Sequence, residues 1–359
     1  MDFSNSAVTL IIDKYAQDPV RLVNTRSTAI AQACIGQKPE TARVILRSVL
    51  GLCPVAQAFA LDAAVALFDA PYSSRTALAR SKLVAVEAIL ETLRVLSLDL
   101  KSLVSRARVS DASLKTIGAL RARLWQLSGC SPFDTEAALT LYEEAEALTM
   151  LWLTREKKTI SAIKTAYERF ENLKLAGDRL LSPDEIKSET SLKFLYSQLT
   201  QDPSFALKPR LLGCRVPGAL SRIRAGCDAP EARADFTIKD LVTARFTELR
   251  RVAAGKNPHY GIEAVKLDNQ TAVGIAETAR GTLLHFVRLK DGAIHALHIV
   301  APTEWSFQAG SPMLELMNNY ANTKRSAPKS TESGLKLIAA AFDACTPLFV
   351  QWEKGEHHA

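Results

Sequence analysis

The sequence lacks the cysteine spacing of a disulfide framework or of a local zinc site. Its 359 residues include six cysteines, with no CxxC pair and no dense cluster: Cys34, Cys53, Cys130, Cys214, Cys227 and Cys345. Disulfide-stabilised domains and zinc modules place cysteines in close, repeated spacings. We therefore expect reduced thiols in a reducing cytoplasm, and a chain long enough to bury a core without cross-links.

Long apolar runs are also missing. No stretch approaches the roughly 20 apolar residues that a membrane-spanning helix needs. The first 20 residues, MDFSNSAVTLIIDKYAQDPV, carry acidic side chains early and only a short apolar run, unlike a secretory or twin-arginine leader. These features predict a cytoplasmic protein with no membrane partner.

No local catalytic motif is present. The sequence contains no GxGxxG, Walker loop, GxSxG or HExxH, so any chemistry has to be assembled from distant segments. His295 and His298 lie three residues apart in an expected strand, where they would point to opposite faces and could not share a metal. His357 and His358 end the chain in EHHA, which offers no preorganised site.

The basic residues are not arranged for nucleic acid. The net charge is +7 and the pI is near 9.1, but Lys and Arg are interspersed with Asp and Glu along the chain. The few clusters have no stacking aromatics between them: Arg106 with Arg108, Arg121 with Arg123, and Arg222 with Arg224. We expect no nucleic-acid partner.

Helical periodicity dominates the first 200 residues. Residues 76–104 carry apolar side chains at spacings of three and four without Gly or Pro, which predicts a long core helix. A second helical block follows a cap at Asp134 or Thr135 and contains one break. A further helix is expected to start at Ser182, with Pro183 in its first position.

The second half changes character twice. Residues 201–235 are rich in Pro and Gly and predict irregular structure. Residues 237–255 then predict a helix, and the period shifts toward two with turn signals at 268–269 and 291–292, so two or three antiparallel strands are expected. A last long helix should lead into Cys345.

These patterns predict one α+β domain over residues 1–359, mostly α. Its expected parts are a helical segment at 1–200, an irregular one at 201–235, a helix plus small sheet at 236–305, and a C-terminal helix and tail at 306–359.

Four separated stretches, taken in order, resemble the large subunit of nickel-iron hydrogenases. In that family the motifs R-x-C-G-x-C-x-x-x-H and D-P-C-x-x-C-x-x-H bring four thiolates around a nickel-iron centre. The segment SVLGLCPVAQ matches the first motif at Gly51 and Cys53, and FDACTPLFVQ matches the second at Asp343 and Cys345. Two of the four thiolates are thus present, one from each end of the chain.

The other two stretches lie between these motifs. ETARGTLLHFV looks like the family's E-A-P-R-G-x-L-x-H, with Arg280 at the position of the arginine that faces the iron's diatomic ligands. APTEWSF looks like the family's P-T-x-W-N, with Ser306 in place of Asn. The resemblance covers the chain from about residue 45 to 351, and it implies a long-helix core like that of the large subunit with a small antiparallel sheet.

The departures from the family pattern concern the metal ligands. Leu50 and Leu348 stand where the family has its other two cysteines, and Gln57 and Gln351 replace its two histidines. In the family the first cysteine of each motif is a terminal nickel ligand and the second bridges nickel and iron. The resemblance therefore implies that a complete nickel-iron centre cannot form, and no nickel is expected. The family's chain is cleaved after the second histidine, and Gln351 occupies that position here.

A shortened, cysteine-poor relative of this kind resembles the hydrogenase expression/formation accessory proteins of the HupK/HoxV type. The resemblance implies a non-catalytic maturation scaffold or chaperone that transiently holds the Fe(CN)2CO moiety before its transfer to the large subunit. Cys53 and Cys345 are the implied metal ligands and Arg280 the implied cofactor-binding side chain. The implied partners are hydrogenase maturation chaperones and the hydrogenase large subunit.

Two other interpretations of the sequence remain open. The chain could be a metal-free interaction protein that mimics the large subunit, in which case Cys53 would be dispensable for hydrogenase maturation. It could instead be a divergent large subunit with activity of its own, which predicts bound nickel and hydrogen uptake. The missing thiols argue against the second of these.

Overall fold

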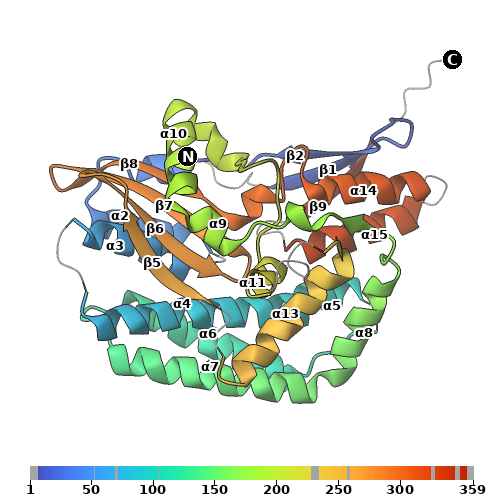
Figure 1. The fold of residues 1–359 in the computed structure, drawn as a ribbon. Coiled ribbons are helices and arrows are strands. Elements are labelled where there is room, and N and C mark those ends of the chain that lie inside the picture. The colour runs from blue at the N-terminus through green and yellow to red at the C-terminus, as the bar shows by residue number, and fades with distance from the viewer. Residues whose placement is uncertain are drawn as a thin grey trace.

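The computed structural model describes residues 7–51, 53–68, 72–104, 106–227, 234–256, 259–324, 328–343 and 348–353. Three parts are visible in Figure 1: a layer of long helices, a four-stranded sheet with helices on both faces, and a three-stranded sheet next to the two C-terminal helices. Within these ranges, no helix has both the length and the apolar character that a membrane span requires.

The helical layer contains the long helix that the periodicity predicts. It runs as α4 (Ser74–Arg94), a π-helical segment η1 (Val95–Asp99) and α5 (Leu100–Leu103). Its neighbours are α6 (Asp111–Gly129), α7 (Thr135–Arg155), α8 (Lys157–Glu168) and α13 (Ile238–Ala253).

The predicted helix ends of this layer are confirmed. Asp134 caps α7 by accepting a hydrogen bond from the Ala137 amide at 3.0 Å. The expected break falls at Glu156, between α7 and α8. Farther along the chain, Pro183 starts α9 (Pro183–Lys187) after Ser182, and Thr237 forms a capping box with Asp240 at the start of α13.

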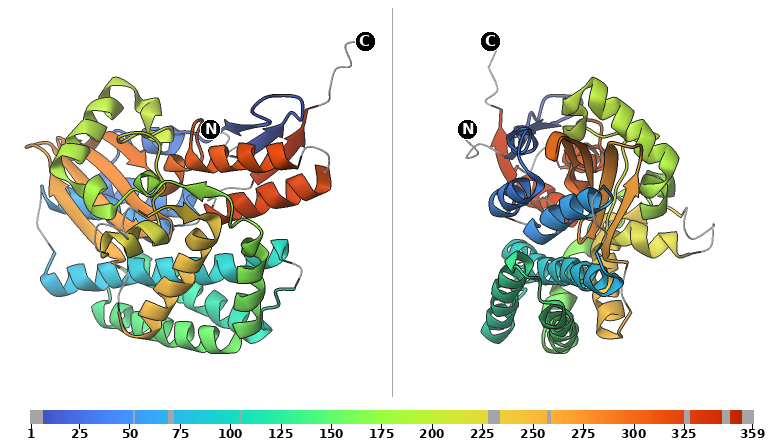
Figure 2. Two further views of the ribbon diagram at one scale, coloured as in Figure 1. Left: turned by 45° about the vertical axis from the view of Figure 1, so that its right-hand side comes forward. Right: turned by 90° about the vertical axis from the view of Figure 1, so that its left-hand side faces the viewer.

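The second sheet has four antiparallel strands where two or three were expected. Their order is the chain order: β5 (Gly261–Lys266), β6 (Thr271–Thr278), β7 (Gly281–Lys290) and β8 (Ala293–Val300). Every residue of β6 is buried, because α3 (Pro54–Ala66) covers one face of the sheet and α10 (Glu189–Gln201) the other, as Figure 2 shows. The alternation that marks a half-exposed strand is therefore weak, which explains the undercount.

Gly274 allows α3 to pack directly on the sheet. A methyl group at this position of β6 would overlap the carbonyl group of Ala60 in α3. Only glycine permits such a close approach of two backbones. The position of α3, and of Cys53 at its start, is therefore set by this contact.

The three-stranded sheet was not predicted. It has the order β2 (Val20–Asn24), β1 (Val8–Ile12), β9 (Leu348–Trp352), and β9 runs parallel to β1 from the opposite end of the chain. The prediction of helix over 1–200 is therefore wrong at β1 and β2, and that of a C-terminal tail is wrong at β9. Short strands of this kind are stabilised by partners distant in sequence, which local periodicity does not reveal.

Two further predictions of secondary structure need correction. The segment 201–235 is not wholly irregular, and a pair of two-residue strands, a second C-terminal helix and several short helices were missed. The missed elements are short, and Pro, Gly or polar residues interrupt their patterns. They are α1 (Ala29–Ala33), α2 (Pro39–Val49), β3 (Lys174–Leu175), η2 (Gly177–Arg179), η3 (Pro203–Leu207), α11 (Ala219–Ala225), β4 (Phe236–Thr237), η4 (Pro302–Trp305) and α14 (Pro312–Thr323). The predicted last long helix is confirmed as α15 (Pro328–Ala341).

Candidate functional site

Cys53 stands at the N-cap position of α3, just before Pro54 in the first helical position. Its sulfur lies 3.7 Å from the side-chain nitrogen of Gln57, one helical turn further on. The thiol is half-buried. Cys53 therefore lies at the amino end of a helix that is packed against the sheet.

The carboxylate of Glu87, which projects from α4, caps the amino end of α3. The two oxygens of Glu87 accept hydrogen bonds from the backbone N–H groups of Val55 and Ala56, both at 2.8 Å. Burial raises the pKa of Glu87 to about 7, although the two hydrogen bonds oppose the rise. Sequence reasoning missed this residue, although Glu87 and Glu91 are two carboxylates at a four-residue spacing in an apolar helix, which is an unusual pattern.

Arg280 lies in the tight turn between β6 and β7. Its side chain is buried, and the following residue, Gly281, has a φ of +124° that favours glycine. Its guanidinium lies 2.6 Å from Glu91 Oε1 and 3.1 Å from Asp343 Oδ1, and its Nε donates to the Asp343 carbonyl at 3.1 Å. Arg280 thus connects α4 with the end of the C-terminal helix.

Glu91 forms ion pairs with three arginines. Besides Arg280, it accepts hydrogen bonds from Arg94 at 2.9 and 3.0 Å and from Arg121 at 2.9 Å. Burial alone would raise the pKa of Glu91, but the hydrogen bonds and positive charges of these arginines outweigh it and lower the pKa to about 2. The carboxylate is therefore ionised, and it neutralises part of the positive charge next to the cavity described below.

Gln57 and His285 form a buried pair. The Gln57 side-chain oxygen lies 2.6 Å from His285 Nε2, and His285 is fully buried on β7. Burial lowers the pKa of His285 to about 3, so the ring is neutral at physiological pH and can donate this hydrogen bond. Gln57 is thereby oriented so that its amide nitrogen faces Cys53.

Cys53, Gln57 and Arg280 line one cavity of about 510 Å³. Leu50, which stands where the hydrogenase motif has its first cysteine, lines it as well. The structure thus brings together two of the three site residues that the sequence predicts, from segments more than 200 positions apart. It also places the side chain that replaces a metal ligand in the same cavity.

The same cavity has a second charged group, which the sequence analysis missed. Arg26 and Glu304 form a buried ion pair at 3.0 Å, and Arg26 also donates to the Thr303 hydroxyl at 3.1 Å. All three residues line the cavity. Burial raises the pKa of Glu304 to about 7, against the opposing charge of Arg26. Glu304 lies within the segment APTEWSF. The resemblance of this segment to the hydrogenase motif P-T-x-W-N could have identified Glu304 as a candidate site residue.

Cys345, the third predicted site residue, lies outside the described residues. The described chain reaches Asp343, whose carboxylate and carbonyl both contact Arg280. Among the residues that the structure describes, no group of three or more His, Cys, Asp and Glu side chains is placed to hold a metal ion. A ligand set drawn from the described residues alone would therefore be incomplete.

The remaining histidines and cysteines are dispersed. His295 is exposed on β8, whereas His298 lines the cavity; His357 and His358 lie outside the described residues. Cys34 is buried, and burial raises the pKa of its thiol to about 11, which makes it unreactive.

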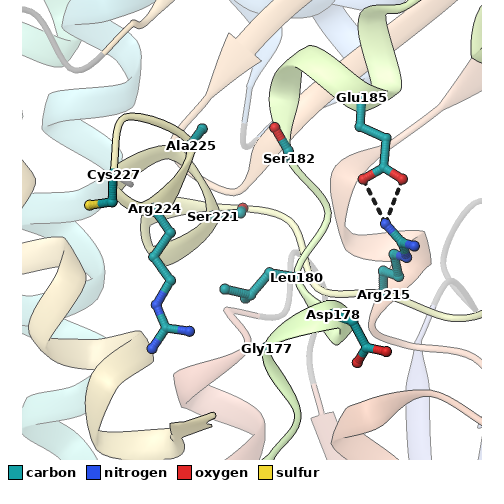
Figure 3. A pocket seen from close by; sticks show the side chains of 10 residues that line it. All are labelled: Gly177, Asp178, Leu180, Ser182, Glu185, Arg215, Ser221, Arg224, Ala225 and Cys227. Atoms are coloured by element: carbon teal, nitrogen blue, oxygen red, sulfur yellow. Dashed lines mark hydrogen bonds and ion pairs between the residues drawn. The ribbon is translucent and has the colours of Figure 1, made fainter. Parts of the chain in front are cut away.

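A separate cavity of about 540 Å³ lies between η2, α9 and α11 (Figure 3). Arg215 and Glu185 face each other across one side of it and form an ion pair at 2.6 Å. Cys227 lies on the other side, and its thiol donates a hydrogen bond to the Ile223 carbonyl at 3.4 Å. Arg224 donates to the Ala234 and Asp235 carbonyls, so three of the four charged side chains have partners within the protein, and we assign the cavity no role.

No protein-family model matches the chain. Individual proteins do match over most of its length. The hydrogenase expression/formation protein HupK of Azotobacter vinelandii is 28% identical, with 92% of this chain and 94% of that protein covered. HupK of Rhizobium leguminosarum bv. viciae is 26% identical, with 89% of each chain covered. Over most of its length the chain is thus similar to hydrogenase expression/formation proteins.

Solved structures of hydrogenases also superpose on this chain. The Ni-Fe-Se hydrogenase from D. vulgaris Hildenborough superposes with a TM-score of 0.58 at 14% identity, over 91% of this chain and 92% of that chain. An NAD+-reducing [NiFe]-hydrogenase superposes with a TM-score of 0.54 at 14% identity, over 93% and 94%. The chain therefore has the α+β, mostly α fold of the nickel-iron hydrogenase large subunit, as predicted.

Proposed function

We propose that this protein is a non-catalytic accessory protein in the formation of a nickel-iron hydrogenase. In this proposal it transiently holds the Fe(CN)2CO moiety as cargo, with Cys53 and Cys345 as iron ligands, and passes it to the hydrogenase large subunit. The observation that carries the proposal is that Cys53 and Arg280 line one cavity. The similar proteins are named hydrogenase expression/formation proteins, which supports a role in hydrogenase formation.

The chemistry of the cavity is compatible with such a cargo. Thiolates suit soft metals, and an iron that carries cyanide and carbon monoxide needs few protein ligands because the diatomics occupy several coordination positions. A guanidinium offers fixed donors to cyanide nitrogens. Arg280 lies at the cavity with its orientation fixed by Glu91 and Asp343.

The residues on either side of the second thiol in the sequence belong to described structure. Cys345 follows Asp343 by two residues in the sequence, and Asp343 is bound to Arg280 at the cavity. Beyond Cys345, the described chain resumes as β9, which is paired with β1. Described structure thus flanks residues 344–347 on both sides in the sequence.

The replaced ligands argue for transfer rather than catalysis. Leu50 lines the cavity at the position where the hydrogenase motif supplies a terminal nickel ligand, and a leucine side chain cannot coordinate nickel. With two thiolates in place of four, the iron fragment would be bound without nickel and released more easily. Maturation chaperones would deliver the fragment, and the large subunit would receive it.

Infrared spectroscopy tests the proposal. The protein is purified anaerobically from cells that express the hydrogenase maturation machinery, and its iron and nickel contents are measured. We expect cyanide and carbon monoxide stretching bands and iron without nickel. The Cys53→Ala and Cys345→Ala variants should each lose the bands, because each removes one of two iron ligands.

The matched control is Cys130→Ala, since Cys130 is exposed and lies outside the cavity. Retention of the bands in Cys53→Ala would contradict the assignment of Cys53. Absence of the bands from the wild-type protein, under conditions that load a known maturation protein, would favour the metal-free interaction protein. Nickel together with hydrogen uptake would favour a divergent hydrogenase.

A further inference from the structure

Glu87 performs a task that usually belongs to the residue at position 53. At a helix N-terminus, the N-cap side chain ordinarily accepts a hydrogen bond from the backbone N–H of the second or third helical residue. In α3 these are Val55 and Ala56, and both donate to Glu87, which projects from α4. Cys53, the N-cap residue itself, makes no capping hydrogen bond.

This arrangement determines where the thiol of Cys53 can lie. Sulfur is a weak hydrogen-bond acceptor and a carboxylate a strong one, so Glu87 outcompetes Cys53 for the two N–H groups. The sulfur instead receives the Gln57 amide, and Cys53 lines the cavity. Without Glu87, the two donors would be left unsatisfied in a buried place, and the nearest available acceptor would be the residue at position 53.

We propose that Glu87 is the positioning residue of Cys53. By capping α3 from the neighbouring helix, it releases residue 53 from that task and keeps its thiol directed to the cavity that Arg280 lines. The capping role stands on geometry alone, whereas its consequence for iron binding rests on the function proposed above.

The carboxylate is the group that this site requires. Two N–H donors, each 2.8 Å from a different oxygen, need two acceptors side by side. A glutamine offers one acceptor and one NH2 group, which would face one of the donors. An aspartate is one methylene shorter and would not reach from α4. The Glu87→Gln variant is therefore the conservative test.

The first experiment is a double-mutant cycle on thermal unfolding of the whole chain without iron, at about pH 8, where Glu87 is ionised and both of its oxygens accept. Glu87→Gln should lower the unfolding midpoint by at least about 2 °C, because one capping bond is lost. Cys53→Asp alone should also lower it, since two carboxylates would then compete for the same donors. The double variant should regain stability relative to Glu87→Gln, because the aspartate at position 53 can cap α3 itself. Additive effects would overturn the proposal.

The second experiment uses the bound iron fragment to report on the position of the Cys53 thiol. In protein loaded as above, Glu87→Gln should shift or weaken the cyanide and carbon monoxide bands and lower the affinity for the iron fragment about 10-fold or more. Glu156→Gln is the matched control. Glu156 is also a buried carboxylate that accepts a backbone N–H at a helix start, from Ser110 at 3.1 Å, but that helix carries no cavity cysteine.

The two proposals can fail separately. Unchanged bands in Glu87→Gln, or equal loss in Glu156→Gln, would overturn the positioning role while leaving the iron site intact. If wild-type protein shows no bands at all, the iron function fails, and the unfolding cycle still decides whether Glu87 caps α3 in place of Cys53.

Discussion

Buried charges around the cavity are neutralised in pairs and short networks. Arg280 with Glu91 and Asp343, and Arg26 with Glu304, have side chains less than a tenth exposed. Taking charges out of water is costly, and such pairs contribute to specificity of structure more reliably than to stability. Their presence next to a lone thiol therefore indicates a site whose side-chain positions are fixed before any ligand arrives.

Glu304 and Glu87 should make stability depend on pH in an unusual direction. Burial raises the pKa of each from its ordinary 4.5 to about 7. Between about pH 4.5 and 7 the folded chain then binds more protons at these carboxyls than the unfolded chain does. The free energy of unfolding from these two groups should fall as the pH rises through this window.

Urea unfolding at pH 5 and pH 7.5 measures this effect. The Glu304→Gln variant should show a smaller difference between the two pH values than the wild type, whatever its overall stability. Glu136→Gln, at an exposed side chain, serves as the control. An identical pH dependence in wild type and Glu304→Gln would contradict the assignment. Glu91 acts oppositely: its pKa is held near 2, so its contribution is lost only as the pH falls below about 4.5.

At the scale of elements, the contact between α3 and β6 controls the site. Gly274→Ala should force α3 away from the sheet, because the new methyl group would meet the Ala60 backbone, which cannot rotate aside. We expect a loss of about 1–3 kcal/mol or more in the free energy of unfolding. The infrared bands should be lost with it, since Cys53 moves with α3.

A second glycine substitution provides the comparison. Gly118 lies exposed inside α6, where an added methyl group meets nothing within 4 Å. Gly118→Ala should therefore stabilise the protein by up to about 1 kcal/mol through helix propensity. Chemical denaturation of both variants measures the difference, and equal effects of the two substitutions would refute the packing argument.

Elements that depend on local signals were predictable from the sequence. The caps at Asp134 and Thr237, the long helix at α4 and the turns of the four-stranded sheet follow from side chains within a few residues. The strands β1, β2 and β9 do not, because their pairing is set by the tertiary structure. In the site, Cys53 and Arg280 were found through motif resemblance, whereas Glu87 and Arg26 act through contacts between distant segments, which no local pattern records.

At the scale of the whole molecule, the two ends of the chain are joined in one sheet. β9 supplies apolar side chains at Leu348, Val350 and Trp352 that pack against the core, and the Glu353 amide donates to the Ile12 carbonyl at 2.9 Å. The segment that carries Cys345 is followed directly by this strand. We therefore expect iron binding at the proposed site to depend on the pairing of β9 with β1.

Truncation tests this dependence. Removing the chain from residue 348 onward keeps Cys345 but deletes β9, and it should lower the free energy of unfolding by about 2–4 kcal/mol through lost apolar burial. Iron and the infrared bands should be lost as well. Removing only residues 354–359 is the control and should change neither. Full iron loading of the shorter chain would show that β9 is not needed for the site.

The parallel pairing of β1 with β9 also has a consequence for biosynthesis. β9 follows β1 in the chain, so all the residues between the two strands are synthesised while one edge of β1 has no partner. An unpaired strand edge is a template for pairing with other chains. The growing polypeptide thus exposes a strand edge that can pair with other chains until β9 has been made, and a nascent-chain chaperone that covers β1 would raise the yield of correctly paired protein.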